Sequence, residues 1–285
     1  MSTTVAFVGG GGAGDMAAVE AGDGKSILID CSIHPGNQSE VMRNLFLLLD
    51  ASQFDMFIAL HAVSNRVQGL SAINDRFYIR KMWDAGIAAG ADETISGYKS
   101  MRAQTGVQEI DRPVLHKFGS TRLGLVRAIP TAKADKPGGP LILRIADVGD
   151  GDKEHGAVLF MSDSTPAFWD EAFSVLPMEL LRADVLVAGG HGAFGLGPGA
   201  GADQIGQAVD ILAKLSPSVL VIADNAFEDA EQATVKAVLA GFSKICPKTE
   251  IVDIGEVGPT VFQFNAKGVS VEINEQRRPV ERLAS

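Results

Sequence analysis

The order of apolar and polar positions predicts strands that alternate with helices along most of the chain. Apolar runs of strand length lie at Thr3–Val8, Ser26–Asp30, Phe54–Leu60, Arg122–Ile129, Pro140–Val148, Gly156–Met161, Asp184–Ala188, Ser218–Ala223, Thr260–Asn265 and Gly268–Ile273. Helices are predicted at Gln68–Phe77, Glu93–Gly106, Pro166–Leu181, Gln204–Leu215 and Asp229–Phe242. The sequence shows no internal repeat of fixed short period, which argues against a solenoid or a propeller.

The segment between the first two strands allows two interpretations. The glycines of Gly9–Gly14 follow a strand, and Asp30 ends the next strand, which is the outline of a dinucleotide-binding fingerprint. However, only Asp15–Ala21 could form the crossover helix, and about two helical turns are short for that purpose. In the rival interpretation Met16–Glu20 is a strand and Gly22-Asp23-Gly24 a hairpin turn, and the Asp-Gly step favours this hairpin.

Composition and charge narrow the class of protein. The chain has 285 residues, 46% of them hydrophobic, and a formal net charge of −10, which argues against nucleic acid as the main partner. Cys31 and Cys246 lie in apolar stretches and match neither a disulfide framework nor a zinc spacing, as expected of reduced core thiols. Because no signal-like or membrane-length apolar run is present, we expect a cytoplasmic protein that does not enter a membrane.

One short segment carries the most specific pattern. Residues 60–70 read LHAVSNRVQGL. This segment resembles the His-x-His-x-Asp-His motif of the metallo-β-lactamase superfamily, which is followed, after two intervening residues, by Gly and an apolar residue. In that frame the chain keeps His61, Gly69 and Leu70, whereas Val63, Asn65 and Arg66 stand in the other three ligand positions.

Further segments are similar to that superfamily in the same order, and within it to the competence-type hydrolases related to the soluble domain of the DNA-uptake channel. They are Val5–Val8, Gly14-Asp15, Ile27–Asp30, Met161-Ser162-Asp163, Ala183–Leu186, Gly190-His191-Gly192, Ser216–Val219 and Gly258–Phe262. The resemblance implies an α/β fold, a four-layer αβ/βα sandwich in which residues 1–285 form a single domain. It also implies a site at the open edge of that sandwich.

The resemblance further implies a zinc site that has lost most of its ligands. Valine cannot bind a cation, arginine repels one, and asparagine lacks the carboxylate charge. Ile129 occupies the position of the middle histidine, and the last histidine is either lost at Gly190 or kept as His191. The candidate metal ligands that remain are His61, Asp163 and His191, so no cofactor is expected beyond zinc at low occupancy.

The relic site consists of His61, Asn65, Arg66, Asp163 and His191, and three of these residues also have a purely structural interpretation. His61 could be a hydrogen-bonded histidine at a strand end, Asp163 the N-cap of the following helix, and His191 a turn residue. Arg66 suggests a more specific hypothesis, because a partly buried Asp163 without its metal must be paired or neutralised. We therefore predict an Arg66–Asp163 salt bridge.

Three functions follow from these interpretations. The first is a non-catalytic protein that acts on a protein partner as a binding, scaffold or regulatory subunit. The second is a metal-dependent hydrolase of phosphodiester or nucleotide substrates that uses His61, Asp163 and His191. The third is a Rossmann-like nucleotide-binding protein that uses Gly9–Gly14.

Overall fold

The computed structural model of the protein describes residues 2–9, 14, 16–49, 52–87, 95–128, 138–188, 196, 199–222, 229–273 and 276–280. For residues 229–231, 276 and 277 it describes the backbone only. The helices are α1 (Gln38–Leu48), α2 (Ser64–Val67), α3 (Leu70–Asn74), α4 (Ser96–Thr105), α5 (Pro166–Val175), α6 (Met178–Leu181), α7 (Ala202–Leu215), α8 (Asp229–Ile245) and α9 (Ile254–Val257).

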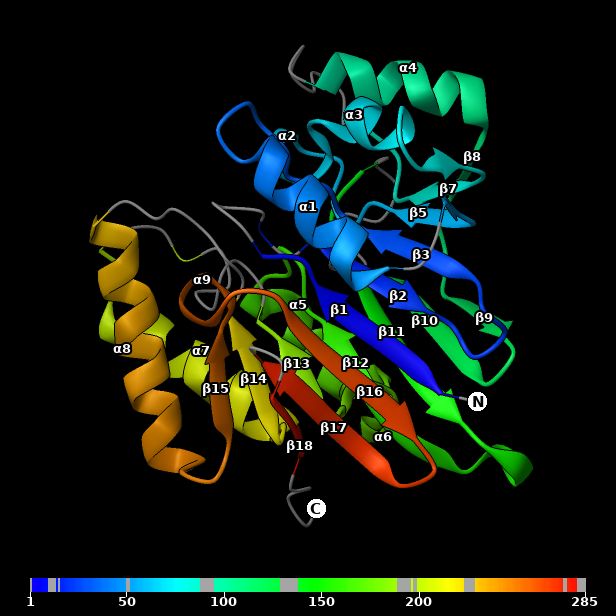
Figure 1. The fold of residues 1–285 in the computed structure, drawn as a ribbon. Coiled ribbons are helices and arrows are strands. Elements are labelled where there is room, and N and C mark those ends of the chain that lie inside the picture. Colours follow the sequence, from blue (N-terminus) through cyan, green and yellow to red (C-terminus); the bar gives the residue numbers. More distant parts are fainter. Residues whose placement is uncertain are drawn as a thin grey trace.

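Strands of the described residues form two large sheets and one small one (Figure 1). In spatial order the first sheet is β18 (Gln276–Pro279), β17 (Gly268–Ile273), β16 (Thr260–Asn265), β1 (Thr3–Phe7), β2 (Ala17–Glu20), β3 (Ser26–Ile29), β5 (Met56–Ile58), β7 (Met82–Asp84) and β8 (Val107–Glu109). The second is β15 (Glu250–Asp253), β14 (Val219–Ile222), β13 (Val185–Val187), β12 (Glu154–Phe160), β11 (Leu141–Val148), β10 (Thr121–Arg127) and β9 (Val114–Phe118). The small sheet pairs β4 (Gln53–Phe54) with β6 (Tyr78–Ile79).

Each large sheet has an antiparallel part and a parallel part. In the first sheet the strands from β18 to β3 pair antiparallel, and those from β3 to β8 pair parallel. In the second, β9 to β12 pair antiparallel and β12 to β15 pair parallel. Parallel strands need both faces covered, which explains why all four residues of β3 and of β14 are buried.

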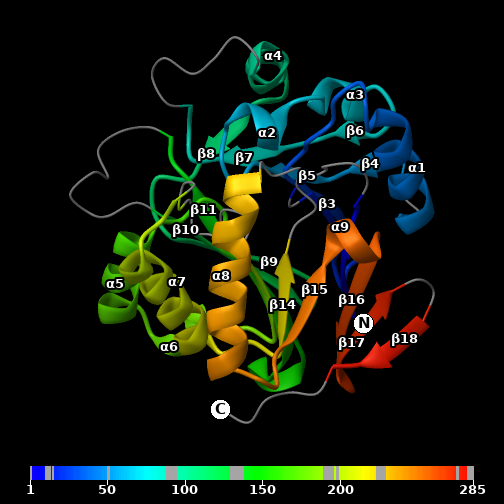
Figure 2. The same cartoon turned by 90° about the vertical axis from the view of Figure 1, so that its left-hand side faces the viewer.

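The core lies between the two sheets, and helices cover their outer faces. Phe7 of β1 packs on Phe160 of β12, with ring centroids 5.8 Å apart, so the sheets meet face to face. Outside the first sheet, Phe57 contacts Tyr98 of α4, and outside the second, Leu220 shares a cluster with Phe242 of α8. Figure 2 shows α5 and α7 at the left of the molecule, α8 in front, and α1 and α3 at the upper right. The expected four-layer αβ/βα sandwich is therefore confirmed.

The N-terminal hairpin interpretation is correct, and the dinucleotide-binding one is wrong. β1 pairs antiparallel with β2, and β2 pairs antiparallel with β3, so a strand stands where a crossover helix would have to be. The turn at Gly22-Asp23-Gly24 is closed by the N–H of Gly24, which donates to the carbonyl of Ala21 at 2.8 Å. Residues 10–13 of the glycine-rich segment lie outside the described residues.

Other predicted elements are present with changed boundaries. The helix predicted at Pro166–Leu181 ends at Val175 and restarts at Met178, because Pro177 has no N–H and cannot continue a helix. The strand predicted at Phe54–Leu60 is divided between β4 and β5. Helix α1 was not predicted, although its buried side chains Val41 and Leu45 have helical spacing.

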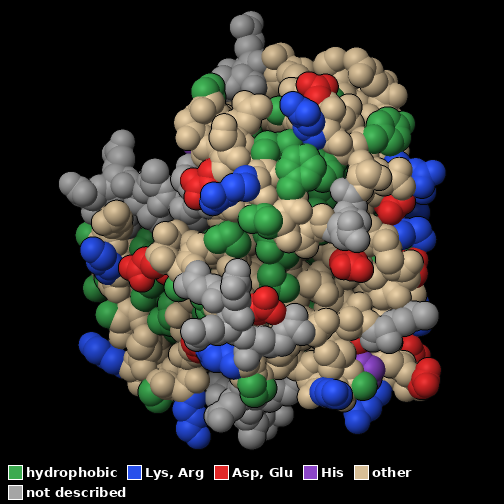
Figure 3. Space-filling model, in the orientation of Figure 1, with side chains coloured by type: hydrophobic (Ala, Val, Ile, Leu, Met, Phe, Trp, Pro, Cys, Tyr) green, Lys and Arg blue, Asp and Glu red, His purple; other side chains and the backbone are tan. Residues whose placement is uncertain are grey.

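Several large apolar side chains lie at the surface. Phe46 and Leu47 at the end of α1 are 59% and 77% exposed, and Tyr78 of β6 is 62% exposed. Figure 3 shows hydrophobic side chains gathered in the upper half of the face that carries α1. Across the described residues, no helix combines the length and the apolar character that a membrane crossing requires.

Candidate functional site

Three strand ends meet at one edge of the sandwich and bring the predicted site residues together. Asp30 follows β3 and His61 follows β5, which are parallel neighbours, so both residues leave the first sheet at the same edge. Asp163 follows β12 of the second sheet. A hydrogen bond from the N–H of Leu141 to the carbonyl of Leu60 (2.6 Å) joins the two sheets here.

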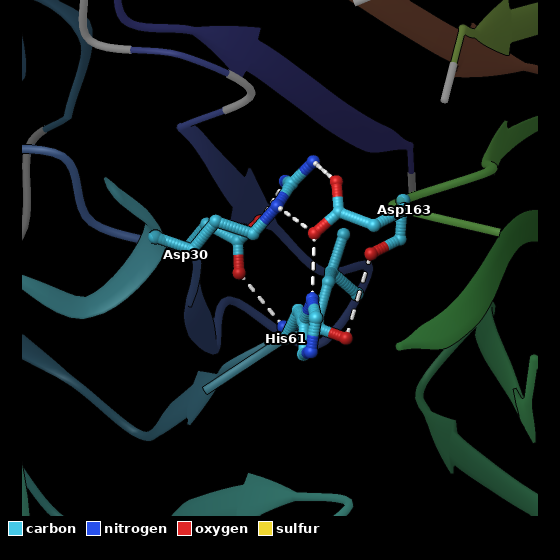
Figure 4. A network of polar contacts seen from close by, with 6 residues as sticks. Asp30, His61 and Asp163 are labelled. Carbon is cyan, nitrogen blue, oxygen red and sulfur yellow. Dashed lines mark hydrogen bonds and ion pairs between the residues drawn. The ribbon is translucent and has the colours of Figure 1, made fainter. Parts of the chain in front are cut away.

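Arg66 lies at the centre of this edge, with only 3% of its side chain exposed. It is carried by α2, the short helix that follows His61. Its Nη2 donates to Oδ1 of Asp163 at 2.7 Å and its Nε to Oδ2 of the same carboxylate at 3.1 Å. The remaining Nη1 donates to Oδ2 of Asp30 at 2.6 Å (Figure 4). The predicted Arg66–Asp163 salt bridge is therefore present, in the bidentate geometry that a guanidinium allows.

Asp30 is the member of the network that the sequence interpretation missed. Its carboxylate is 2% exposed, and its Oδ1 accepts the N–H of Leu60 at 2.7 Å while Oδ2 binds Arg66. The residue has a left-handed backbone conformation, with φ of 51°, which turns the chain sharply where β3 ends. An acidic residue at the end of a fully buried strand was the available signal, but the glycines before it suggested a nucleotide site.

His61 completes the network from the other side of Asp163. Its Nδ1 lies 2.6 Å from Oδ2 of Asp163, and because a carboxylate only accepts, Nδ1 is the donor. Figure 4 shows the second ring nitrogen, Nε2, pointing away from Asp163. The side chain is 24% exposed, and in the described parts of the chain no hydrogen-bond partner of Nε2 is found.

The charge of Asp163 is fixed by these neighbours. Burial by itself would raise the pKa of this carboxyl, but the charge of Arg66 and the hydrogen bonds from His61 and Arg66 outweigh burial. The pKa of Asp163 is therefore held well below its ordinary value of 3.8. Among the described residues, the two carboxylates and the guanidinium of this cluster sum to one negative charge.

The side chains that the structure describes at this edge do not fit a metal ion. Both oxygens of Asp163 and both of Asp30 already accept hydrogen bonds, and the guanidinium of Arg66 holds the position of a cation between them. No group of three His, Cys, Asp or Glu side chains among the described residues could hold a metal ion. Asn65 is exposed, whereas its neighbour Arg66 is buried. Gly190, His191 and Ile129 lie outside the described residues.

The contacts of Asp163 and His61 distinguish between the interpretations of these two residues. Asp163 is not the N-cap of α5, since that helix starts at Pro166 and its cap residue is Thr165. Its side chain binds Arg66 and His61 instead. His61 is a hydrogen-bonded histidine that follows a strand, as the simpler of its two interpretations stated.

A second buried carboxylate lies at the end of the neighbouring strand β7. Asp84 is fully buried and accepts bonds from Tyr98 and from Nε (2.7 Å) and Nη2 (2.9 Å) of Arg102. Tyr98 and Arg102 both belong to α4, so this pair attaches the helix to the sheet. The sequence interpretation missed this contact because the residues are 14 and 18 positions apart and follow no known motif.

Comparisons with known proteins identify the fold. The metallo-β-lactamase fold protein YhfI from Bacillus subtilis is 16% identical, with a TM-score of 0.52 over 89% of this chain and 96% of that one. A metal-dependent hydrolase of the β-lactamase superfamily is 12% identical, with a TM-score of 0.54 over 89% and 96% of the chains. The diiron β-hydroxylase CmlA from Streptomyces venezuelae is 15% identical, with a TM-score of 0.57, and the match covers 88% of this chain and 52% of that one.

Comparison by sequence gives no relative. No model of a known protein family matches the chain, and no curated protein matches it. The likeness to the solved structures therefore shows the metallo-β-lactamase fold and leaves the activity to be argued from the site.

Proposed function

We propose that this chain uses the metallo-β-lactamase fold without its metal chemistry and acts by binding a protein partner, as a scaffold or regulatory subunit. The observation that supports this proposal is the buried guanidinium of Arg66, which binds Asp30 and Asp163 at 2.6 and 2.7 Å. A metal ion at Asp163 would stand beside a guanidinium that is 3% exposed, and like charges repel strongly where water is excluded.

The alternative is a metal-dependent hydrolase that uses His61, Asp163 and His191. To bind metal, Asp163 would have to give up Arg66, which would leave a buried guanidinium with one carboxylate partner fewer. The net negative charge of the cluster also disfavours the phosphodiester or nucleotide anions that such a hydrolase would take. Both arguments favour the binding role.

Elemental analysis of the purified protein tests the choice directly. Zinc, iron and manganese per chain would be measured as purified, and again after dialysis against zinc followed by removal of the free metal. We expect values near zero in both samples. About one or two metal ions per chain, as a mononuclear or binuclear site requires, would overturn the proposal.

A protein partner is supported by the surface around α1. Phe46 and Leu47 are more than half exposed, and Phe46 packs on Phe77, the neighbour of the exposed Tyr78, with ring centroids 4.9 Å apart. Contiguous apolar side chains of this size are typical of a surface that a second protein covers. If the chain binds a partner, Leu47→Glu should abolish the complex while Leu115→Glu, at a second exposed leucine, should not.

A further inference from the structure

We propose that Nε2 of His61 is a nucleophilic acceptor site for small electroneutral acyl donors, and that it works without a metal. This inference goes beyond the proposed binding role and does not depend on it. It rests on the way Asp163 and Arg66 hold the imidazole ring.

The first support is the fixed tautomer of the ring. Asp163 is ionised and accepts at 2.6 Å from Nδ1, so the proton of the neutral imidazole stays on Nδ1. The lone pair is then on Nε2, the nitrogen that points away from Asp163 (Figure 4). A histidine held by a carboxylate in this way is the arrangement that enzymes use to direct an imidazole toward a reacting group.

The second support is the charge balance of the cluster. When Nε2 attacks a carbonyl, the ring becomes a cation, and Asp163 is in contact with it through Nδ1. The positive charge of the ring then offsets the negative charge of the carboxylates that the structure describes here. An anionic substrate would be repelled by the same charge, so the expected donors are esters and anhydrides without charge.

The third support is the rigidity of Asp163. Arg66 binds both of its oxygens and is itself anchored to Asp30, which is 2% exposed. Because the carboxylate cannot rotate, the ring that it orients keeps one direction.

The chemical step is a simple acyl transfer. With diethyl pyrocarbonate, the Nε2 lone pair forms a bond to one carbonyl carbon, and the bond from that carbon to the bridging oxygen breaks. Ethyl carbonate leaves with the electron pair, takes up a proton from water and decomposes to carbon dioxide and ethanol. The carbethoxylated ring then loses its Nδ1 proton to water, so that no oxidant or metal is required.

The chain contains a matched control. His155 also bonds an aspartate through Nδ1, at 2.8 Å from Oδ2 of Asp147, and its side chain is 18% exposed. Its other edge, however, lies against Gly149, where an added Cβ would come within 2.5 Å of Nε2. His61 and His155 therefore share the carboxylate contact, and His155 differs in that Gly149 lies against its other edge.

The test uses diethyl pyrocarbonate on the full-length protein in the presence of a chelator, at about pH 8, where an ordinary imidazole is neutral. Peptide mapping by mass spectrometry gives a modification rate for each histidine. We expect His61 to react about ten times faster, or more, than His34, His116 and His155. A rate at His61 equal to or below those of His34 and His116 would overturn the proposal.

The Asp163→Asn variant tests whether the reactivity of His61 depends on the carboxylate that orients its ring or only on the exposure of the ring. We expect this variant to lose the rate advantage of His61, while the unchanged rates of His34 and His116 report an intact fold. An undiminished rate at His61 would show that Asp163 has no part in its reactivity and would overturn the mechanism. The order of the histidine modification rates in the wild type tests the proposal even if the variant does not fold. The proposed function is tested separately, by the metal content of the protein.

Discussion

The side chains of Arg66 and Asp163 join the two sheets of the sandwich through a bidentate salt bridge. Arg66 follows a strand of the first sheet and Asp163 a strand of the second, and their nearest atoms are 2.7 Å apart. Arg66 stands in a ligand position of the metal-binding pattern, and it also binds the buried Asp30. A protein cation thus links carboxylates at the edge where the fold resemblance places a metal ion.

Removing this cation should destabilise the protein strongly. Arg66→Met leaves Asp30 and Asp163 without their shared partner, and breaking a buried ion pair in this way costs about 3–5 kcal/mol. Urea denaturation should show that loss as a lower midpoint. The control is Arg80→Met, because Arg80 is 56% exposed and pairs with Asp55 at 3.4 Å. Such surface pairs contribute about 1 kcal/mol or less, so equal losses in both variants would contradict a central role for Arg66.

The stability that Asp163 contributes should depend on pH in acid. The pKa of this carboxyl is depressed in the folded protein, where burial is outweighed by Arg66 and His61, below the value of 3.8 in the unfolded chain. Between these two values the unfolded chain binds a proton that the folded chain does not, so stability falls as the pH falls.

Comparison with Asp163→Asn isolates this effect from the other carboxyls. The difference in unfolding free energy between the wild type and the variant should have its full size at pH values above 3.8, the pKa of this carboxyl in the unfolded chain. It should shrink steadily as the pH is lowered from about 5 to about 2, measured by urea denaturation at each pH. A difference that stays constant over this range would show that the ionised form of Asp163 is not what the fold stabilises.

Replacing the protein cation by a ligand should create a metal site. Arg66→His places an imidazole near His61 and Asp163, which together give three ligands, the number that zinc sites with an open position have. We expect about one zinc per chain after dialysis, against nearly none in the wild type. Arg66→Lys keeps a cation at this position and should remain free of zinc. Zinc binding by the lysine variant would show that the positive charge is not what excludes the metal.

The salt bridge could be predicted from the sequence because the spacing of the motif is retained although most of its metal-binding side chains are replaced. Once His61 and Gly69 fixed the register, Arg66 had to occupy a ligand position, and a carboxylate without a metal needs a cation. The turn at Gly22–Gly24 was predictable for a similar reason, since its Asp-Gly step has a strong local preference for a hairpin.

The parts that could not be predicted depend on contacts distant in the chain. Asp30 and Arg66 are 36 residues apart in sequence. They meet only because the parallel strands that precede them, β3 and β5, end at the same edge of the sheet. Likewise, the contact of Arg102 with Asp84 is set by how α4 lies on the sheet. Local periodicity holds no information on such pairings.

Gly69, the glycine of the motif, should be irreplaceable for a reason that Gly151 does not share. Both have a left-handed backbone, with φ and ψ of 77° and 4° at Gly69 and of 70° and 24° at Gly151, so alanine at either position costs about 1–2 kcal/mol in strain. At Gly69 a Cβ would also lie 2.5 Å from the carbonyl oxygen of Ile33, whereas nothing lies within 4 Å of a Cβ at Gly151. Gly69→Ala should therefore cost about 1–3 kcal/mol more than Gly151→Ala in urea denaturation. Because the loop before Gly69 is held by the N–H of Cys31, which donates to the carbonyl of Arg66 at 2.6 Å, the clash should also displace the guanidinium. Equal losses in the two variants would show that the close approach to Ile33 does not constrain this loop.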